Sequence, residues 1–306
     1  MLLKNLVAYR LGPRWNTNAE TLEKKLAKQP LQACGSFEMQ SRGWLSARAD
    51  QQGGDERLLY TQNHHWLLTL GTEHKLLPAS VIRQFAKERA AQVAGQQAWP
   101  IGAKQMRDIT DQVRTELMPR ALSRRSLSRA WIDSTQRWLL VDAAADKAAE
   151  EFLEALRRVD DDLPAKRLDT KSSPGTAMTQ WLSRGEAPGN FSIDQDLEMI
   201  APDTSKATVR YSRHTLEGKD IRDHISAGKT VTRLGLTWKD RISFVLTDKL
   251  YIKRIYFIDI LNDDANAEPD DEAERFDTDF ALMTGELSLL LADLVEALGG
   301  EKELGE

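Results

Sequence analysis

Residues 138–158 read WLLVDAAADKAAEEFLEALRR, an apolar run followed by a stretch in which apolar side chains recur every three or four positions. The run from Trp138 to Val141 predicts a buried strand. The stretch from Ala145 to Arg158 predicts an amphipathic helix, because side chains three or four residues apart lie on one face of a helix. That face consists of Ala148, Phe152, Ala155 and Leu156. A strand that leads directly into such a helix predicts an α/β layer.

The same unit begins the chain, where a strand at Leu6–Leu11 precedes a helix at Ala19–Gln29. Asn18 suits the N-cap of this helix, since its short polar side chain can accept a hydrogen bond from the first helical turn. Further strands are expected at Gly43–Ala49, Trp66–Leu70 and Ala130–Ile132. We therefore predict a central α/β domain formed by residues 1–76 and 122–170.

Residues 77–121 have a helical pattern with one interruption. Helices are predicted at Ser80–Gln97 and Ala103–Met118. Trp99–Gly102 between them predicts a tight turn, because proline removes a backbone donor and glycine tolerates turn conformations. Two helices joined in this way form an antiparallel hairpin. Its apolar positions are sparse, so we expect the hairpin to project from the body as a tip.

A third region, the base, is expected at residues 171–306, after a connector that contains Pro164 and the turn-rich residues 171–175. Its strands should form an antiparallel sheet, and they are expected at Thr208–Tyr211, Thr230–Trp238, Ile242–Leu246 and Tyr251–Ile258. Alternation in the last strand predicts Leu250, Ile252 and Arg254 on one face, and Tyr251, Lys253 and Ile255 on the other. The predicted fold class is α+β.

The chain closes with an acidic loop, Asn262–Glu274, and a helix that stops at Gly299 and Gly300. One face of the helix is apolar and consists of Leu287, Leu290, Leu291, Leu294, Val295 and Leu298. Such a face packs either against the core of its own chain or against a partner, and both interpretations stay open at this point.

The composition is that of a globular protein, since 41% of the 306 residues are apolar and 29% are charged. No stretch approaches about 18 consecutive apolar residues, so we expect no membrane-spanning helix. Cys34 is the only cysteine, which excludes an intramolecular disulfide and a cysteine-built metal site. A reducing cytoplasm is the expected location.

The net charge of −5 hides a segregation of charge along the chain. Residues 104–129 contain seven basic and three acidic side chains, and residues 206–254 contain twelve basic and five acidic ones. Residues 259–306 contain sixteen acidic and two basic ones. Because phosphate groups respond to local fields, the basic regions can bind DNA while the acidic region faces away. The alternative is that these basic residues only form the solvent-exposed faces of ordinary helices and strands.

The sequence AGKT at residues 227–230 ends like a nucleotide-binding phosphate loop. Such a loop needs a second glycine five residues before Gly228, so that backbone amides can wrap the phosphate. That position is occupied by Asp223. Gly228 is instead expected to end a helix from Gly218 to Ala227, with a strand beginning beyond it.

No metal site is predicted, although His64, His65 and His74 lie close together along the chain with Glu73. Adjacent residues of a strand point to opposite faces, so only one of His64 and His65 is expected to join any cluster. The acidic side chains of residues 263–272 lack the alternating ligands and central glycine of a calcium loop. No serine stands in a G-x-S-x-G elbow. We therefore predict no catalytic residue, no cofactor and no enzymatic activity.

A phosphate-binding segment is predicted at residues 117–126, LMPRALSRRS. Proline stops the preceding helix, so an extended or turning segment with three arginines should follow. Guanidinium groups match phosphate oxygens with two parallel hydrogen bonds, and the serine hydroxyls add neutral donors. Leu122 within this segment can also be explained as a buried anchor.

Several segments, in the same order and spacing, resemble the RdgC family of recombination-associated proteins. They include KNLVAYRL at 4–11, LMPRA at 117–121 and LMTGE at 282–286. The others are residues 75–78, 81–82, 123–124, 131–133, 227–229, 231–232, 241–242, 244–245, 275–277, 279–280 and 296–301, together with Trp238. An ordered set over nearly the whole length is far more specific than any single motif.

The resemblance implies a homodimer closed into a ring by contacts at both ends of each subunit. Its basic central hole would surround double-stranded DNA without reading the sequence. It also implies a nucleoid-associated protein that restrains a RecA-type recombinase by occupying DNA. The family often has an aromatic residue where Leu122 stands and a lysine-rich hairpin tip where residues 99–102 stand, so the resemblance implies less about contacts at the tip.

Carried over to this sequence, the family's DNA-facing segments resemble Pro119, Arg120 and Leu122, and Arg213, His214 and Lys229. The predicted DNA-binding residues are therefore Arg120, Leu122, Arg124, Arg125, Arg213, His214, Lys229 and Arg233. Phosphate contacts of this kind supply affinity but little sequence preference.

Two other functions remain as alternatives. A protein-interaction module would inhibit the recombinase directly through its acidic surface and touch DNA only incidentally. A hydrolase or nuclease would need metal-dependent turnover, for which the sequence offers no ligand cluster.

Overall fold

The computed structural model describes residues 3–48, 57–97, 99–258 and 272–302. The acidic loop expected at Asn262–Glu274 and the loop expected at residues 51–55 fall wholly or mostly outside the described residues. Within the described part of the chain, no helix is both long enough and apolar enough to cross a membrane.

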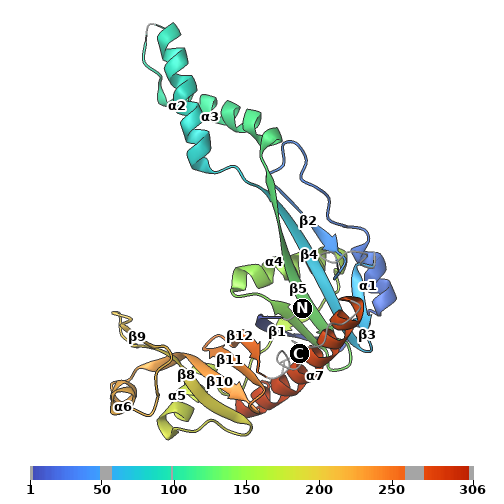
Figure 1. Cartoon of the computed structure of the whole chain (residues 1–306), viewed down its shortest axis with the longest axis vertical. Helices are drawn as coiled ribbons and strands as arrows, with labels where there is room; N and C mark the ends of the chain where they lie inside the picture. The colour runs from blue at the N-terminus through green and yellow to red at the C-terminus, as the bar shows by residue number, and fades with distance from the viewer. Residues whose placement is uncertain (1–2, 49–56, 98, 259–271, 303–306) are drawn as a thin grey trace.

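Helices and strands alternate irregularly along the chain (Figure 1). The strands are β1 Asn5–Leu11, β2 Gln40–Leu45, β3 Leu59–Gln62, β4 His65–Lys75, β5 Ser123–Asp133, β6 Trp138–Asp142, β7 Ala165–Arg167, β8 Phe191–Ile200, β9 Thr208–Tyr211, β10 Thr230–Trp238, β11 Ile242–Thr247 and β12 Tyr251–Phe257. The helices are α1 Ala19–Leu26, α2 Ala79–Gln96, α3 Ala103–Leu117, the 3₁₀ turn η1 Met118–Arg120, α4 Asp146–Val159, α5 Pro174–Arg184, α6 Lys219–Ser226 and α7 Glu272–Ala297.

All twelve described strands belong to one antiparallel sheet, so the two separate sheet regions expected from the sequence are continuous. The strand order is β2-β4-β5-β6-β1-β12-β11-β10-β8-β9, with β3 paired to β4 and β7 paired to β1. The first strand of the chain joins the halves, because Leu6 lies opposite Asp142 of β6 on one side and Ile252 of β12 on the other. The mixed α/β fold with a large antiparallel sheet is confirmed. The predicted limits of the three domains stay a prediction.

The two faces of the sheet are covered by different helices. Alternate residues of β1 enter different cores: Leu6 and Ala8 join the one covered by α5 and α7, while Val7 and Tyr9 join the one covered by α1 and α4. The hydrogen bond predicted at the N-cap of α1 is present, since the Asn18 side chain accepts from the Thr21 amide at 2.8 Å.

The apolar face of α7 packs against its own chain. Leu287, Leu290, Leu291, Leu294 and Leu298 are at most 1% exposed, and Val295 is partly buried against the same core. The interpretation of this face as a core face is therefore confirmed, and its interpretation as a partner surface is wrong.

The helices α2 and α3 extend away from the sheet at one end of the molecule (Figure 1). They hold a small core of their own, formed by Ile82, Ala86, Ile109 and Val113. Few apolar side chains are buried there, which agrees with the sparse pattern of the sequence.

Several elements have no counterpart in the sequence prediction, namely β3, β7, β8 and α5. The turn-rich residues 171–175 in fact start α5, because Ser173 caps the helix by accepting from the Thr176 amide and Pro174 occupies its first turn. Serine, proline and glycine favour both turns and helix starts, which is why the local pattern was ambiguous.

The strict alternation predicted for β12 is wrong beyond Lys253. Ile252 and Ile255 both enter the core beneath α7, whereas Arg254 between them is exposed with a φ of 54°. The pairing of β11 with β12 shifts register at this point. A β-bulge adds one residue to a strand and so moves the following side chains to the other face.

Two adjacent leucines of α7 test the packing of this helix. Leu290→Ala should lower the free energy of unfolding by about 2–5 kcal/mol, because it leaves a cavity in the core beneath the sheet. Leu289 is 54% exposed, so Leu289→Ala should change it by less than about 0.5 kcal/mol. Urea unfolding followed by tryptophan fluorescence measures both. Equal effects of the two substitutions would contradict this orientation of α7.

Candidate nucleic-acid interface

The helical hairpin is carried by a ribbon of β4 and β5, and the other edge of β4 is paired with β2 as far as His74. The strands β4 and β5 pair over eleven positions, from His65 opposite Asp133 to Lys75 opposite Ser123. At the far end of this ribbon β4 leads into α2, and α3 returns through η1 to β5. We call residues 73–78 and 118–125 the neck. The chain enters the hairpin from β4 and leaves it into β5. Because these two strands are paired, the sheet determines the position of the neck.

The predicted phosphate-binding segment lies in the neck and is exposed. It turns at η1, which ends at Arg120, and continues as β5, so the expectation of an extended or turning segment is confirmed. Arg120, Arg124 and Arg125 are all exposed. Leu122 is 78% exposed, which excludes the interpretation of this side chain as a buried anchor.

A buried lysine fixes the turn that carries Arg120. The Lys75 ammonium donates to the carbonyl oxygen of Met118 at 3.0 Å and to that of Ser36 at 2.9 Å. Lys75 is only 9% exposed. Sequence reasoning overlooked this residue, because a lysine followed by two leucines and a proline carries no sign that its ammonium is buried.

The neighbouring Glu73 is held in its ionised form. The Ser123 hydroxyl and the Cys34 amide donate hydrogen bonds that lower the pKa of Glu73, and the Arg125 guanidinium lowers it further. Nη2 of Arg125 lies 3.6 Å from Oε2 of Glu73. A guanidinium has five N–H donors and this contact is longer than a hydrogen bond, so Arg125 keeps donors for an external anion.

The second set of predicted residues surrounds α6. Arg213 and His214 follow β9 in an exposed loop, where Arg213 has a φ of 52°. Nδ1 of His214 lies 2.8 Å from the carbonyl oxygen of Thr215. Nζ of Lys229 lies 3.1 Å from Nδ1 of His224, so this ammonium is partly engaged within the chain.

The AGKT sequence does not form a phosphate loop. Gly228 has a φ of 82° and its amide donates to the carbonyl of Ile225, so it ends α6 as expected. A phosphate loop runs from a strand into a helix, whereas here the helix comes before the glycine and β10 after it.

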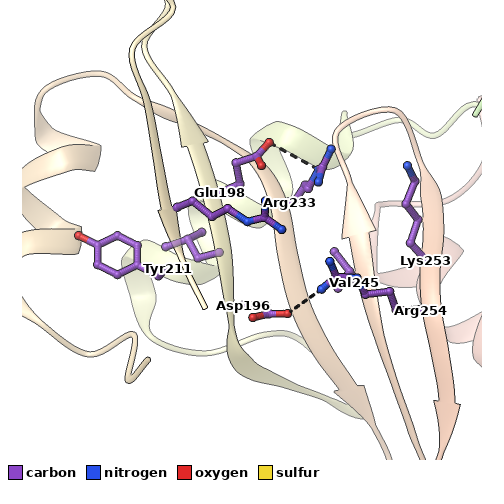
Figure 2. A pocket seen from close by; sticks show the side chains of 9 residues that line it. Asp196, Glu198, Tyr211, Arg233, Val245, Lys253 and Arg254 are labelled. Carbon is purple, nitrogen blue, oxygen red and sulfur yellow. Dashed lines mark hydrogen bonds and ion pairs between the residues drawn. The ribbon is translucent and has the colours of Figure 1, made fainter. Parts of the chain in front are cut away.

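Beside this region the sheet forms a groove with a basic lining (Figure 2). The ionisable side chains that line it are Arg210, Arg233, Lys253, Arg254, Asp196, Glu198 and Tyr211. Nε of Arg233 lies 3.5 Å from Oε1 of Glu198, and Nη1 of Arg254 lies 3.2 Å from Oδ2 of Asp196. Of these basic residues only Arg233 belonged to the predicted site.

Lys253 lies among other positive charges in this groove. Partial burial lowers its pKa, and the positive charges of Arg233, Arg254 and Lys249 lower it further. Its Nζ lies 4.9 Å from the centre of the Tyr251 ring. A phosphate in the groove would offset this repulsion. In the sequence, basic residues that interrupt apolar strands indicated a basic surface on this sheet. That pattern did not identify Lys253 in particular.

Asp146 lies at the edge of an adjoining groove that shares Arg233 and Lys253 with the first. Hydrogen bonds from the Tyr251 hydroxyl and the Arg167 guanidinium lower the pKa of Asp146. Lys249 adds a positive charge at 3.6 Å. This carboxylate therefore holds α4 against β7 and β12.

The structure does not bring the two predicted sets together. Figure 1 shows the neck between the sheet and the α2–α3 hairpin, and β9 with α6 at the end of the molecule opposite that hairpin. Within one chain, the neck arginines and the residues around α6 are two separate basic segments. A small anion could contact only one of them, whereas an extended polyanion can contact both.

The prediction that His64 and His65 point to opposite faces is wrong. His64 lies in the turn after β3, and only His65 belongs to β4. Their ring centroids are 4.0 Å apart, and both side chains lie near Asp133. Burial and the neighbouring His64 lower the pKa of His65, while the charge of Asp133 raises it.

The sequence matches a family model described as "Putative exonuclease, RdgC" over residues 1–301. It is 48% identical over 303 residues to the recombination-associated protein RdgC of Janthinobacterium sp. (strain Marseille), and this match covers 99% of each chain. It is 47% identical to the protein of the same name from Cupriavidus pinatubonensis, covering 99% of this chain and all of the relative. The identity to the Bordetella pertussis protein of that name is 45% over 304 residues, again covering 99% of this chain and all of the relative.

Lys75 provides a test of the neck. Lys75→Met should lower the free energy of unfolding by about 1–3 kcal/mol, because the carbonyls of Ser36 and Met118 lose their donor. Hydrogen exchange should also accelerate at the Ala121 amide, which bonds to Met118. Lys24 is exposed on α1 and serves as the control, since Lys24→Met should leave both measurements unchanged. Unchanged exchange at Ala121 in Lys75→Met would refute the anchoring role.

Asp146 predicts a pH dependence of stability. Its pKa is lower in the folded chain than its ordinary value of 3.8, so its ionised form stabilises the fold above that value. This contribution is lost as the pH falls through the folded-state pKa. Asp146→Asn should therefore lower the urea midpoint at pH 7, and the difference from the wild type should vanish in acid. Asp161→Asn, at an exposed site, is the control, and a pH-independent difference for Asp146→Asn would contradict the assignment.

Proposed function

Because this chain belongs to the RdgC family of recombination-associated proteins, we propose that it binds double-stranded DNA without reading its sequence. We further propose that two copies enclose the DNA as a ring and thereby restrain a RecA-type recombinase. The observation that carries the proposal is the pair of separate basic segments, one in the neck below the α2–α3 hairpin and one around α6 and β9 (Figure 1). Their spacing suits a long polyanion better than a small ligand.

The chemistry of both segments is that of phosphate binding. Arg120, Arg124 and Arg125 are exposed in the neck, and Arg213, Lys229 and Arg233 lie around α6 and β10. Guanidinium groups bind phosphate oxygens in a bidentate way, and each bound phosphate releases counterions. Contacts to phosphates orient a protein on the duplex but carry no sequence information. The proposed interface therefore gives affinity that depends on salt and little on sequence.

The groove of Figure 2 would add contacts of a different kind. Arg233 and Arg254 are paired with Glu198 and Asp196, so DNA would have to compete with these carboxylates. Such competition makes each contact weak. A closed ring compensates for weak contacts, because release then requires the ring to open as well. His214 and Leu122 would contact DNA through ring and methyl surfaces rather than through charge.

The proposed role needs no catalytic residue and no cofactor. Occupying DNA is sufficient to restrain a recombinase that must assemble on the same DNA. The protein would then reside in the cytoplasm, on the nucleoid. The net charge of −5 does not oppose this, since binding depends on the local basic segments.

Two competing functions predict different behaviour. A protein-interaction module would inhibit the recombinase equally well after its DNA-contacting arginines were removed. An exonuclease, as the description of the family model names it, would shorten DNA ends in the presence of a divalent metal ion.

The deciding experiment is duplex DNA binding across a salt series. The double variant Arg120→Ala, Arg213→Ala should bind more weakly than the wild type to unrelated sequences alike. The slope of log affinity against log salt should fall by about 0.9 for each phosphate contact removed. Arg14 and Arg184 are exposed arginines outside both basic segments, so Arg14→Ala, Arg184→Ala is the charge-matched control and should keep the wild-type slope.

The same samples separate the alternatives. Light scattering should give the mass of a dimer, and end-labelled duplex should stay intact with magnesium or manganese. Absence of duplex binding at low salt would refute the proposal. If the double variant loses DNA binding yet still inhibits the recombinase, direct protein contact replaces DNA occupation as the mechanism. Metal-dependent shortening of the duplex would establish the exonuclease instead.

A further inference from the structure

Three side chains with metal-ligating atoms meet at the end of strands β4 and β5 that is opposite the neck. His64 lies in the turn between β3 and β4, His65 begins β4, and Asp133 ends β5. One ligating atom from each of the three lies within 4.8 Å of the others. This cluster shares no residue with the proposed DNA interface and plays no part in that proposal.

The backbone holds the three residues in register. His65 and Asp133 are direct partners in the ladder between β4 and β5. Both the amide and the hydroxyl of Ser134 donate to the carbonyl oxygen of His64, each at 2.9 Å. The turn that carries His64 is therefore tied to the strand that carries Asp133. Ligands positioned by paired strands lose little freedom when they bind an ion.

Only one of the two carboxylate oxygens of Asp133 accepts hydrogen bonds from described residues. Its Oδ1 accepts hydrogen bonds from the amides of Thr135 at 3.0 Å and Gln136 at 2.8 Å. Its Oδ2 is buried and has no hydrogen-bond partner among the described residues. A buried polar atom without a partner costs free energy, and a buried carboxylate oxygen costs the most unless a cation compensates it.

His65 does not supply the missing hydrogen bond. Its Nδ1 lies 3.8 Å from Oδ2 of Asp133, beyond hydrogen-bonding distance. The indole nitrogen of Trp131 lies 3.2 Å from the same Nδ1. Since an indole N–H can only donate, this Nδ1 carries a lone pair and not a proton. This nitrogen and the carboxylate oxygen therefore lie 3.8 Å apart with no proton between them.

We propose that His64, His65 and Asp133 form a binding site for a divalent first-row transition metal ion, of which zinc suits the donor set best. Two imidazole nitrogens and one carboxylate oxygen match three-ligand zinc sites that keep a fourth position open. In a tetrahedral site neighbouring ligand atoms lie about 3.4 Å apart, so the gap between His65 and Asp133 must close only slightly. His64 is exposed in a turn and can supply the larger adjustment.

The ion would join two turns of the sheet, one between β3 and β4 and one between β5 and β6. It would compensate the unpaired oxygen of Asp133 and compete with the Trp131 indole for Nδ1 of His65. Because it binds only the folded arrangement, it would stabilise the folded chain, and above the dissociation constant this stabilisation would grow with the logarithm of the ion concentration.

Zinc titration of the full-length protein without an affinity tag tests the site. We expect one zinc ion per chain by calorimetry, with binding weakened at least about tenfold in His64→Ala and in Asp133→Asn. His64 is exposed, so His64→Ala should fold normally even if Asp133→Asn does not. His74 is also exposed on β4 but lies outside the cluster, so His74→Ala should bind zinc as the wild type does.

A second readout locates the ion. Zinc should shift the NMR signal of the Trp131 indole N–H, because the metal takes the lone pair that this group donates to. It should also raise the melting temperature of the wild type and of His74→Ala, but not of His64→Ala. The proposal is overturned if the wild type binds no zinc at micromolar concentrations. It is equally overturned if His64→Ala and Asp133→Asn bind zinc as tightly as the wild type. Neither result bears on DNA binding.

Discussion

The pairing of β1 along both of its edges is the constraint on which the rest of the structure depends. Leu6 lies opposite Asp142 on one side and Ile252 on the other, so a strand from the start of the chain closes a sheet whose halves are more than a hundred residues apart. The alternation of β1 then sends neighbouring side chains into the two cores. Without this strand, α7 would have no continuous sheet surface to cover.

The continuous sheet also sets the spacing of the two basic segments. The ribbon of β4 and β5 carries the neck away from one half of the sheet, and β10, β8 and β9 form the other end of the strand order. Both basic segments adjoin paired strands, the neck at the end of β4 and β5 and the loop of Arg213 and His214 directly after β9. The sheet therefore sets their approximate separation, which suits an extended ligand.

Several arginines of the basic regions are partly neutralised by carboxylates of the same chain before any ligand binds. Arg125, Arg233 and Arg254 each lie near a carboxylate of the same chain. The three guanidinium groups are largely exposed to solvent, so these ion pairs contribute little stability and a phosphate can replace the carboxylate. The same carboxylates weaken every individual contact. An interface of this composition favours binding that is broad, reversible and sensitive to salt.

The sequence by itself determined what depends on neighbouring residues: the cap of α1 at Asn18, the end of α6 at Gly228, the helical hairpin and the exposed arginines after Pro119. Periodicity, capping and proline act within a few residues, so a linear pattern reveals them. Only the tertiary structure decided that the two expected sheet regions form one sheet, and that Lys75 and Lys253 belong to the basic regions. It also decided that a bulge at Arg254 moves the following side chains to the other face, and that His64 lies close to Asp133. These features depend on pairs of residues far apart along the chain, and no local pattern specifies which strand edges will meet.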